Sequence, residues 1–568
     1  MFEIKVMPES FKLKGGTLQR PEGGSDRAEL VSVRNSFAAF QLLIESDEPY
    51  SINTGRSLYI SQNNNAAVYR VEADSPFRTD LFIESMHTAE YLTPYADGLL
   101  PGDHADFDGV PSVIWVEAEI PADAVPGLYD FTVRVFRSRM LGAEEPVCAI
   151  PGRIEVLRYV LPDVRSRKLH LDLWQHSSNI ARQHETPLWS EAHFSVLEPY
   201  IKSLGELGQK AVTVIAGETP WCGQGCGRER RVRANMYEYS MIPVRRGADG
   251  AFSYDFSIMQ RYIDLCAKYG IDREISVYGL CNIWENGAFK KPAPDHPDAV
   301  RLRYYDEASG RYAFMTRGRD IDDYIRALER YFIETKQIGL VRIAADEPAD
   351  IGAYRRSVEH IRSVAPSFRF KAAINHAAFI GEFGAVIDDF VPYIEGLSAE
   401  YERICEYKRT MPGKRFLWYV CCGPESPNTF IRSPLTESYA IGVLTSFAGM
   451  DGFLRWSYTD WTDDPRTEIN YPAFPAGDIA LVYPARNGKP MLTLRYKALR
   501  RGFELYELLE ALKEKGLTGA LEEAYDCVLR HRDIRLSANG GMFSAEYADY
   551  VQLMRIAAEA LAGADRLG

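Results

Sequence analysis

The chain has 568 residues, of which 46% are hydrophobic and 26% charged, and its formal net charge is -13. This length predicts more than one domain, and this composition excludes a disordered chain. Nucleic-acid binding is not expected, because a phosphate backbone needs a basic face and no Lys/Arg cluster stands free of nearby acids. The N-terminus has neither a signal-peptide pattern nor a long apolar run. We therefore expect a cytoplasmic protein with no membrane partner.

The nine cysteines follow no regular spacing, which favours reduced thiols over a disulfide framework. Cys222 and Cys226 could be half of a zinc site, but no second Cys or His pair lies nearby at a suitable spacing. For Cys421 and Cys422, which follow an apolar run, packing or a place in a pocket wall is expected. The sequence therefore predicts no metal site and no cofactor, and it leaves the oligomeric state open.

Residues 1–163 have the pattern of an antiparallel β-sandwich. Segments 29–46 and 110–136 are rich in β-branched and aromatic residues, and the second is divided by a turn at Pro126 and Gly127. Short strands in series with turn signals between them are typical of this fold. We expect an N-terminal sandwich domain over this range.

From residue 164 the pattern changes to strands that alternate with helices. One helical pattern begins near Phe194 and stops at Gly208. Repeated βα units predict a (β/α)8 barrel over 164–493, while a doubly wound sheet would need a Gly-rich phosphate turn that the first strand lacks. The helical remainder, 494–568, is expected to pack on the barrel. The eight candidate strands are 168–174, 211–217, 274–280, 340–346, 369–375, 386–391, 415–421 and 452–458.

Two adjacent acids, Asp346 and Glu347, end the fourth candidate strand. Active sites of such barrels form at the C-terminal ends of the strands, although a strand that simply runs into solvent is the alternative. Successive side chains of a strand point to opposite faces, so the pair can act together only where the strand has ended. Pro348, which restricts Glu347, is consistent with a break there.

Aromatic and polar residues near other strand ends are candidates for contacts with a sugar, and for each of them a packing role is the alternative. Acids ringed by Trp and Tyr suit glycosidic-bond cleavage, in which one acid protonates the departing oxygen and a second group stabilises the cationic centre. The candidates are Trp174, His176, Asn375, Trp418, Tyr419, Trp456, Tyr458 and Trp461.

Two arginines lie inside candidate strands, Arg342 and Arg455. If they are buried they must pair with acids, because an unpaired buried charge is costly. Asp451 and Asp460 are the partners that the sequence suggests.

The adjacency of the two acids favours one variant of retaining hydrolysis. A conventional retaining enzyme takes its acid and its nucleophile from separate segments. An adjacent pair suggests instead that the 2-acetamido group of the substrate is the nucleophile. In that scheme Glu347 is the acid/base, and Asp346 orients the acetamido nitrogen and balances the charge of an oxazolinium intermediate.

Six segments stand out in order along the chain: LHLDLWQ (169–175), IAADEP (343–348), FLWYVCCGPESPN (416–428), DGFLRWSYTDW (451–461), GDIALVYP (477–484) and LRYKALRRGFELYELL (494–509). Together they resemble glycoside hydrolase family 123 and related proteins with the domain of unknown function 4091. The resemblance implies a β-sandwich followed by a barrel, and retaining, substrate-assisted hydrolysis of β-linked N-acetylgalactosamine. It also implies the roles above for Asp346 and Glu347.

Two alternatives remain open, and a carbohydrate is the expected partner in each. The same barrel could act on another sugar, with a nucleophile such as Glu218 or Glu400 from a different strand. It could also be a carbohydrate-binding protein that has lost catalysis.

Overall fold

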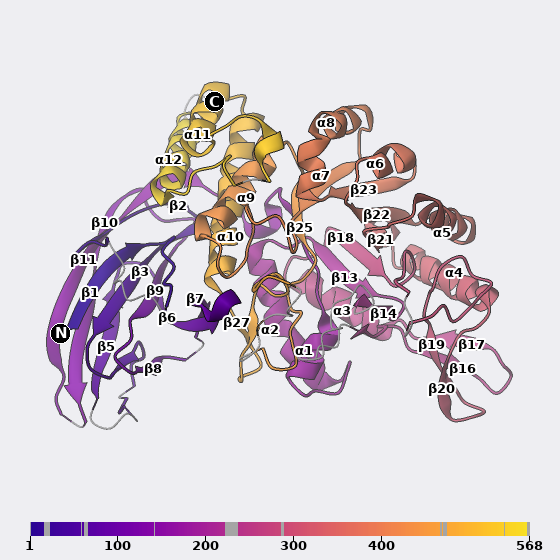
Figure 1. The fold of residues 1–568 in the computed structure, drawn as a ribbon, viewed down its shortest axis with the longest axis horizontal. Coiled ribbons are helices and arrows are strands. Elements are labelled where there is room, and N and C mark those ends of the chain that lie inside the picture. Colours follow the sequence, from indigo (N-terminus) through magenta and orange to yellow (C-terminus); the bar gives the residue numbers. More distant parts are fainter. Residues whose placement is uncertain are drawn as a thin grey trace.

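The computed structural model of the chain describes residues 2–15, 23–57, 59–61, 66–100, 102–140, 142–221, 237–285, 289–465, 469, 474–538 and 540–564. Two N-terminal sheets lie on one side and an eight-stranded parallel barrel on the other, with the C-terminal helices between them (Figure 1). The predicted multidomain α/β architecture is therefore confirmed. Cys222 and Cys226 lie outside the described residues. In the described part of the chain, no helix has both the length and the apolar character needed to cross a membrane.

The N-terminal sheets pack face to face. All strand pairs of the first sheet are antiparallel, whereas the second contains two parallel pairs, β2 with β11 and β4 with β5. In spatial order the first sheet is β1 (Phe2–Pro8), β3 (Ser36–Ser46), β9 (Ser112–Ile120), β6 (Thr79–Thr88) and β7 (Pro94–Leu99). The second is β2 (Ala28–Arg34), β11 (Glu145–Val160), β10 (Gly127–Arg139), β5 (Ala67–Asp74), β4 (Tyr50–Asn53) and β8 (His104–Phe107).

Strand β3 is buried on both faces, which explains its nearly continuous apolar sequence. Leu42 and Ile44 belong to the core between the two sheets, and Leu43 belongs to the core shared with the barrel and the C-terminal helices. Because successive side chains of a strand alternate, this one strand contributes to two hydrophobic cores.

The barrel contains all eight predicted strands. In chain order they are β12 (His170–Leu173), β13 (Ala211–Ile215), β18 (Glu274–Tyr278), β21 (Val341–Asp346), β22 (Arg369–Ile374), β23 (Ile387–Pro392), β24 (Arg415–Tyr419) and β25 (Gly452–Arg455). Neighbouring strands pair in parallel from β13 through β25 to β12. A parallel bridge between Leu171 and Gln209 joins the two ends of this sheet, so the barrel is nearly closed.

Helices cover the outside of the barrel. The predicted stop of the 194–207 pattern is confirmed, because α2 ends at Leu207 and Gly208 has the left-handed backbone typical of a helix C-terminus. The helices are α1 (Ser177–Gln183), α2 (Glu191–Leu207), α3 (Ser257–Lys268), α4 (Gly318–Glu334), α5 (Ile351–Val364), α6 (Ala378–Phe383), α7 (Ile394–Ala399), α8 (Tyr401–Thr410) and α9 (Leu435–Phe447).

Small sheets are inserted into the loops of the barrel, and the sequence did not predict them. The largest has the spatial order β17 (Phe252–Tyr254), β16 (Val244–Arg246), β19 (Arg303–Asp306) and β20 (Arg311–Phe314). The two-stranded sheets are β14 (Thr219–Pro220) with β15 (Tyr237–Glu238), and β26 (Tyr483–Pro484) with β27 (Pro490–Met491).

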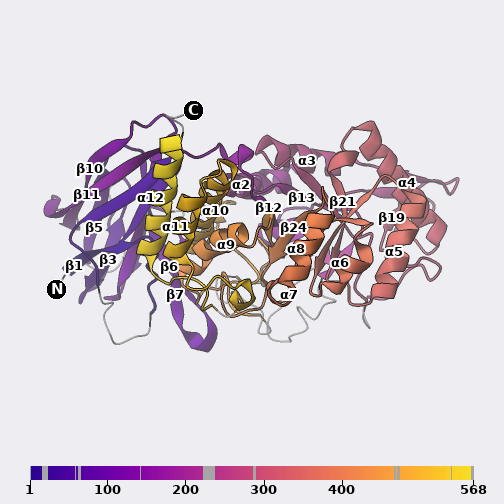
Figure 2. The same cartoon turned by 90° about the horizontal axis from the view of Figure 1, so that it is seen from above.

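Helix α10 (Leu494–Glu514) joins the barrel to the N-terminal sheets, and α11 (Thr518–Val528) and α12 (Tyr547–Ala564) follow it (Figure 2). It meets α9 at Gly442 and Gly502, where a Cβ on Gly442 would lie 1.8 Å from the Gly502 carbonyl oxygen. Two turns earlier, near the start of α10, the buried Arg495 pairs with Asp97 of β7 at 2.9 Å. The close packing against α9 and the buried ion pair with β7 fix α10 between the two parts.

The interior of the barrel holds a buried ionic cluster below the pocket described next. The Lys371 Nζ lies 2.5 Å from an Asp172 oxygen and 2.6 Å from a Glu274 oxygen. Arg342 pairs with Asp389 at 2.8 Å. The predicted pairing of buried arginines with acids therefore holds, but the partner of Arg342 is neither Asp451 nor Asp460.

Candidate active site

A pocket of about 200 Å³ lies at the C-terminal ends of the barrel strands. Its wall combines two adjacent acids with aromatic side chains and two thiols. Acids in an aromatic-lined concavity are what a sugar-cleaving site requires. The lining residues are Trp174, Trp284, Asp346, Glu347, Ala373, Tyr419, Cys421, Cys422, Leu454, Trp456 and Phe474.

Asp346 and Glu347 both reach this pocket because the backbone turns between them. Asp346 is the last residue of β21, and its carbonyl oxygen accepts a hydrogen bond from Asn282 Nδ2 at 2.5 Å. Glu347 has a φ of 40°, in the left-handed region that non-glycine residues seldom adopt. Its amide N–H donates to the Ala373 carbonyl oxygen at 3.0 Å, which fixes the turn to the neighbouring strand. In a continuing strand the side chains of two adjacent residues would point to opposite faces. Because the backbone turns at Glu347, both acids can face the same pocket.

Tyr419 positions the second acid. Its hydroxyl group donates a hydrogen bond to Glu347 Oε1. Burial, together with the nearby Glu347 carboxylate, raises the pKa of Tyr419 well above its ordinary value. The phenol therefore stays protonated, and can donate a hydrogen bond, throughout the pH range in which enzymes usually work.

Two tryptophans of the wall are held by buried acids. Trp174 Nε1 donates to Asp172 Oδ2 at 3.3 Å, and Trp456 Nε1 donates to Asp478 Oδ2, also at 3.3 Å. Asp478 also forms the ion pair of Arg455, at 2.7 Å, so neither Asp451 nor Asp460 has that role. Each indole ring is thus oriented by a buried aspartate that is itself paired with a buried cation, Lys371 for Asp172 and Arg455 for Asp478.

Five of the ten predicted site residues line the pocket, and five do not. Trp418 is buried and donates from Nε1 to Thr445 on α9, because its side chain points away from that of Tyr419, the next residue in β24. Tyr458 and Trp461 are also buried, and their polar atoms bond to Ser203 and to the Val482 carbonyl.

Of the two remaining predicted site residues, His176 is buried and Asn375 is exposed. His176 is fully buried, and its Nε2 lies 3.1 Å from the Trp456 carbonyl oxygen. Burial lowers its pKa to about 4, so the imidazole is neutral and supports the pocket wall from behind. Asn375 follows β22 and is exposed.

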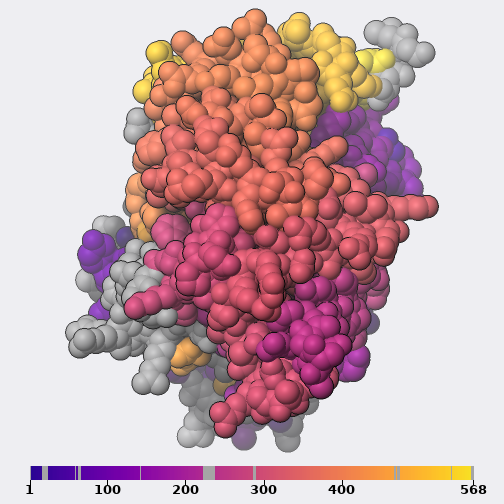
Figure 3. Space-filling model, turned by 90° about the vertical axis from the view of Figure 1, so that its right-hand side faces the viewer, coloured from indigo at the N-terminus to yellow at the C-terminus, as the bar shows by residue number. Residues whose placement is uncertain are grey.

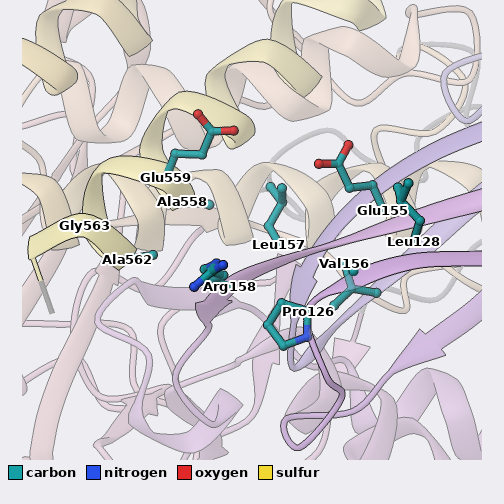
Figure 4. Close-up of a pocket in the computed structure, with 11 residues that line it drawn as sticks. Pro126, Leu128, Glu155, Val156, Leu157, Arg158, Ala558, Glu559, Ala562 and Gly563 are labelled. Atoms are coloured by element: carbon teal, nitrogen blue, oxygen red, sulfur yellow. The ribbon is translucent and has the colours of Figure 1, made fainter. Parts of the chain in front are cut away.

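A larger cavity, of about 620 Å³, lies elsewhere, between α12 and strands β10 and β11 (Figure 4). Small and aliphatic residues line it together with three charged ones, Glu155, Arg158 and Glu559. Arg555 holds Glu155 through two contacts of 2.8 and 3.0 Å. The cavity contains no aromatic ring among the residues that line it. Chemistry therefore favours the smaller pocket of the barrel as the active site.

The model of the glycoside hydrolase 123 catalytic domain matches residues 174–512, more than half of the chain. The chain belongs to glycoside hydrolase family 123. A solved structure of a family 123 glycoside hydrolase from Clostridium perfringens, described in terms of glycolipid glycan hydrolysis, aligns with 100% of this chain and 98% of its own. Its TM-score is 0.72 and its sequence identity 17%, which shows a shared fold.

Two further solved structures align at lower similarity. A β-D-glucuronidase from Dictyoglomus thermophilum has a TM-score of 0.31 and 9% identity, covering 88% of this chain and 97% of its own. A Bacteroides vulgatus protein provisionally described as a glycoside hydrolase has a TM-score of 0.34 and 10% identity, covering 86% and 79%. No curated protein is significantly similar to this chain.

Sequence reasoning missed two aromatic residues in the pocket of this family 123 enzyme, Trp284 and Phe474. Trp284 lies in the loop that follows the third strand, two residues after Asn282, so an aromatic residue there was a usable signal. Phe474 packs on Trp456 with ring centroids 5.6 Å apart. It lies in a long loop after the last strand, where no periodicity could have pointed to it.

The alternative nucleophiles do not face the pocket of the family 123 barrel. Glu218 is buried, and both of its oxygens are bound by Arg303, at 2.6 and 3.0 Å. Glu400 lies at the junction of α7 and α8 and pairs with Arg403 at 3.2 Å. Neither belongs to the residues that line the pocket.

Proposed function

We propose that this glycoside hydrolase releases terminal β-linked N-acetylgalactosamine, or a close N-acetylhexosamine relative, with the substrate's acetamido group as nucleophile. One observation carries the proposal: among the described residues that line the pocket, Asp346 and Glu347 are the only acids, and they are adjacent. A two-carboxylate retaining enzyme needs a second acid about 5 Å from the first, normally on another segment. The other segments contribute aromatic, aliphatic and thiol groups instead.

In the first step, Glu347 protonates the glycosidic oxygen while the acetamido carbonyl oxygen attacks C1 from the opposite face of the sugar. The bond from C1 to the leaving oxygen breaks, and the aglycone departs with the proton of Glu347. The product at this stage is an oxazolinium ion. The carboxylate of Asp346 accepts a hydrogen bond from the acetamido N–H and balances the positive charge on the ring.

In the second step, a water molecule attacks C1 from the side that the aglycone has left. The Glu347 carboxylate takes a proton from this water, so the acid form is restored. The bond from C1 to the acetamido oxygen breaks, and the acetamido group is regenerated. Two inversions at C1 give overall retention of configuration.

The size and lining of the pocket suit this substrate. Its volume of about 200 Å³ lies below the ~300–1,000 Å³ common for drug-sized ligands, which favours one sugar unit and therefore action at a chain end. Trp174, Trp284 and Trp456 offer flat faces for the apolar side of a pyranose ring. The Clostridium perfringens relative, whose description refers to glycolipid glycans, is consistent with a glycan substrate here.

A panel of chromogenic glycosides tests the proposal. We expect the wild type to cleave the β-N-acetylgalactosaminide in preference to the β-galactoside, which lacks the acetamido group. Glu347→Gln should lower kcat at least ~100-fold, the usual contribution of general acid catalysis. Glu400→Gln is the matched control and should retain full activity. Equal cleavage of both sugars, or an active Glu347→Gln variant, would contradict the proposal.

A further inference from the structure

Three side chains that could bind a metal ion lie outside the barrel sheet, at helices α4 and α5. His296 precedes β19, Asp322 is on α4 and His360 is on α5. Helices α4 and α5 are neighbours at the right-hand side of Figure 1, on the face that Figure 3 presents to the viewer. These residues are distant in the sequence, and none of them lines the pocket of the barrel.

The three side chains converge. One ring nitrogen from each histidine and one carboxylate oxygen of Asp322 all lie within 4.8 Å of one another. The Nε2 of His360 is 2.7 Å from Asp322 Oδ1, and the Nε2 of His296 is 3.9 Å from the same oxygen. The imidazole rings meet edge to face, with centroids 4.9 Å apart. A small ion placed between these atoms would need only slight movements to reach normal bond lengths.

His296 has a buried ring nitrogen that lacks a hydrogen-bond partner. Its side chain is 1% exposed, and its Nε2 has no hydrogen-bond partner. Its Nδ1 lies 3.0 Å from the Asp298 carbonyl oxygen, to which it can donate, which leaves the Nε2 lone pair directed at the cluster. In the other tautomer, with Nδ1 accepting from the Asp298 amide at 3.2 Å, a buried Nε2–H would have no acceptor within hydrogen-bond reach. A buried polar atom without a partner is destabilising, and a cation would supply that partner.

We propose that His296, Asp322 and His360 bind a divalent transition-metal ion, of which Zn²⁺ is the best representative. Two imidazole nitrogens and one carboxylate oxygen form a ligand set that suits zinc, whereas Mg²⁺ and Ca²⁺ prefer oxygen ligands. A backbone carbonyl that accepts from the other ring nitrogen is the usual support of a metal-binding histidine. Asp322 and His360 are partly exposed, so water can complete the coordination sphere.

The ion would act on a segment that leads to the active site. The Asp298 carboxylate accepts the amide N–H groups of Asn282 and Ile283, at 2.6 and 3.0 Å. Asn282 in turn binds the carbonyl oxygen of Asp346. Fixing His296 to α4 and α5 would therefore restrain the backbone beside the two acids, while the ion itself remains outside the pocket. This role is structural and does not depend on the proposed substrate.

Metal binding by the full chain tests the inference. Protein without an affinity tag is treated with EDTA, dialysed and titrated with ZnCl₂ in a calorimeter, with MgCl₂ in a parallel titration. We expect saturable binding of zinc and a higher Tm with zinc than with magnesium. Asp322→Asn and His360→Gln should each weaken zinc binding by more than about tenfold and abolish the rise in Tm. His531→Gln, which removes an exposed histidine outside the cluster, is the control and should bind as the wild type does.

Each result of these titrations either supports or overturns metal binding by the cluster. His360 is partly exposed, so His360→Gln is expected to fold even if a change at the more buried positions does not. A wild type that binds no zinc overturns the inference. So does zinc binding that survives both Asp322→Asn and His360→Gln, because the ion would then lie elsewhere in the chain.

Discussion

The hydroxyl group of Tyr419, at the end of the seventh barrel strand, donates a hydrogen bond to Oε1 of Glu347, just after the fourth. In Tyr419→Phe this hydrogen bond is lost, and the proposed acid is less firmly positioned. Loss of one hydrogen bond costs about 0.5–1.5 kcal/mol, so we expect kcat to fall by roughly twofold to tenfold. The measurement is kcat and KM for a chromogenic β-N-acetylgalactosaminide.

Tyr458→Phe is the control for this prediction. It removes a hydroxyl that bonds to Ser203 Oγ at 2.7 Å, outside the pocket. Its kcat should match that of the wild type. If Tyr419→Phe also leaves kcat unchanged, the hydrogen bond has no influence on the proposed acid.

The tryptophans of the pocket should contribute to substrate binding. Trp284→Leu and Trp456→Leu remove aromatic faces that we expect to contact the sugar, at a cost of about 0.5–1.5 kcal/mol. This corresponds to a rise of roughly twofold to tenfold in KM, with a smaller effect on kcat. Trp461→Leu should lower Tm but leave KM unchanged, because Trp461 is buried outside the pocket and donates to the Val482 carbonyl. A KM that changes in Trp461→Leu but in neither of the others would assign the sugar to a different site.

The ionic cluster inside the barrel should be sensitive to the loss of one partner. Lys371→Met leaves the buried carboxylates of Asp172 and Glu274 without their shared cation. Breaking such a cluster costs about 3–5 kcal/mol, so the free energy of unfolding in urea should fall by that amount. Lys268→Met removes an exposed partner of Glu198 and should leave the free energy of unfolding nearly unchanged, because water screens this pair. Similar losses in the two variants would mean that the buried cluster is not coupled to folding.

The strands of the barrel could be predicted because they are short, apolar and regularly separated. The position of Asp346 and Glu347 at the end of the fourth strand followed from that count, and the structure places both at one pocket. The sequence could not show which of Trp418 and Tyr419 faces the pocket. Both are aromatic and adjacent, and which one faces the pocket depends on the phase of the strand relative to the barrel axis.

Contacts between residues that are distant in the chain could not be predicted from the sequence either. Arg455 is bound by Asp478, which follows in a loop after the last strand, although Asp451 and Asp460 lie closer in the chain. The convergence of His296, Asp322 and His360 requires two helices and a loop to meet. No local spacing encodes that meeting, which is why the sequence predicted no metal site.

The role of the acetamido group is the central claim, and a fluorinated substrate series tests it most directly. The measurement is kcat/KM for chromogenic β-N-acetylgalactosaminides whose acetyl group carries zero, one, two or three fluorine atoms. Fluorine withdraws electrons from the carbonyl oxygen and weakens it as a nucleophile, so our account predicts a steep, progressive fall in kcat/KM. A kcat/KM that stays constant across the series would contradict substrate assistance and would require a nucleophile from the protein.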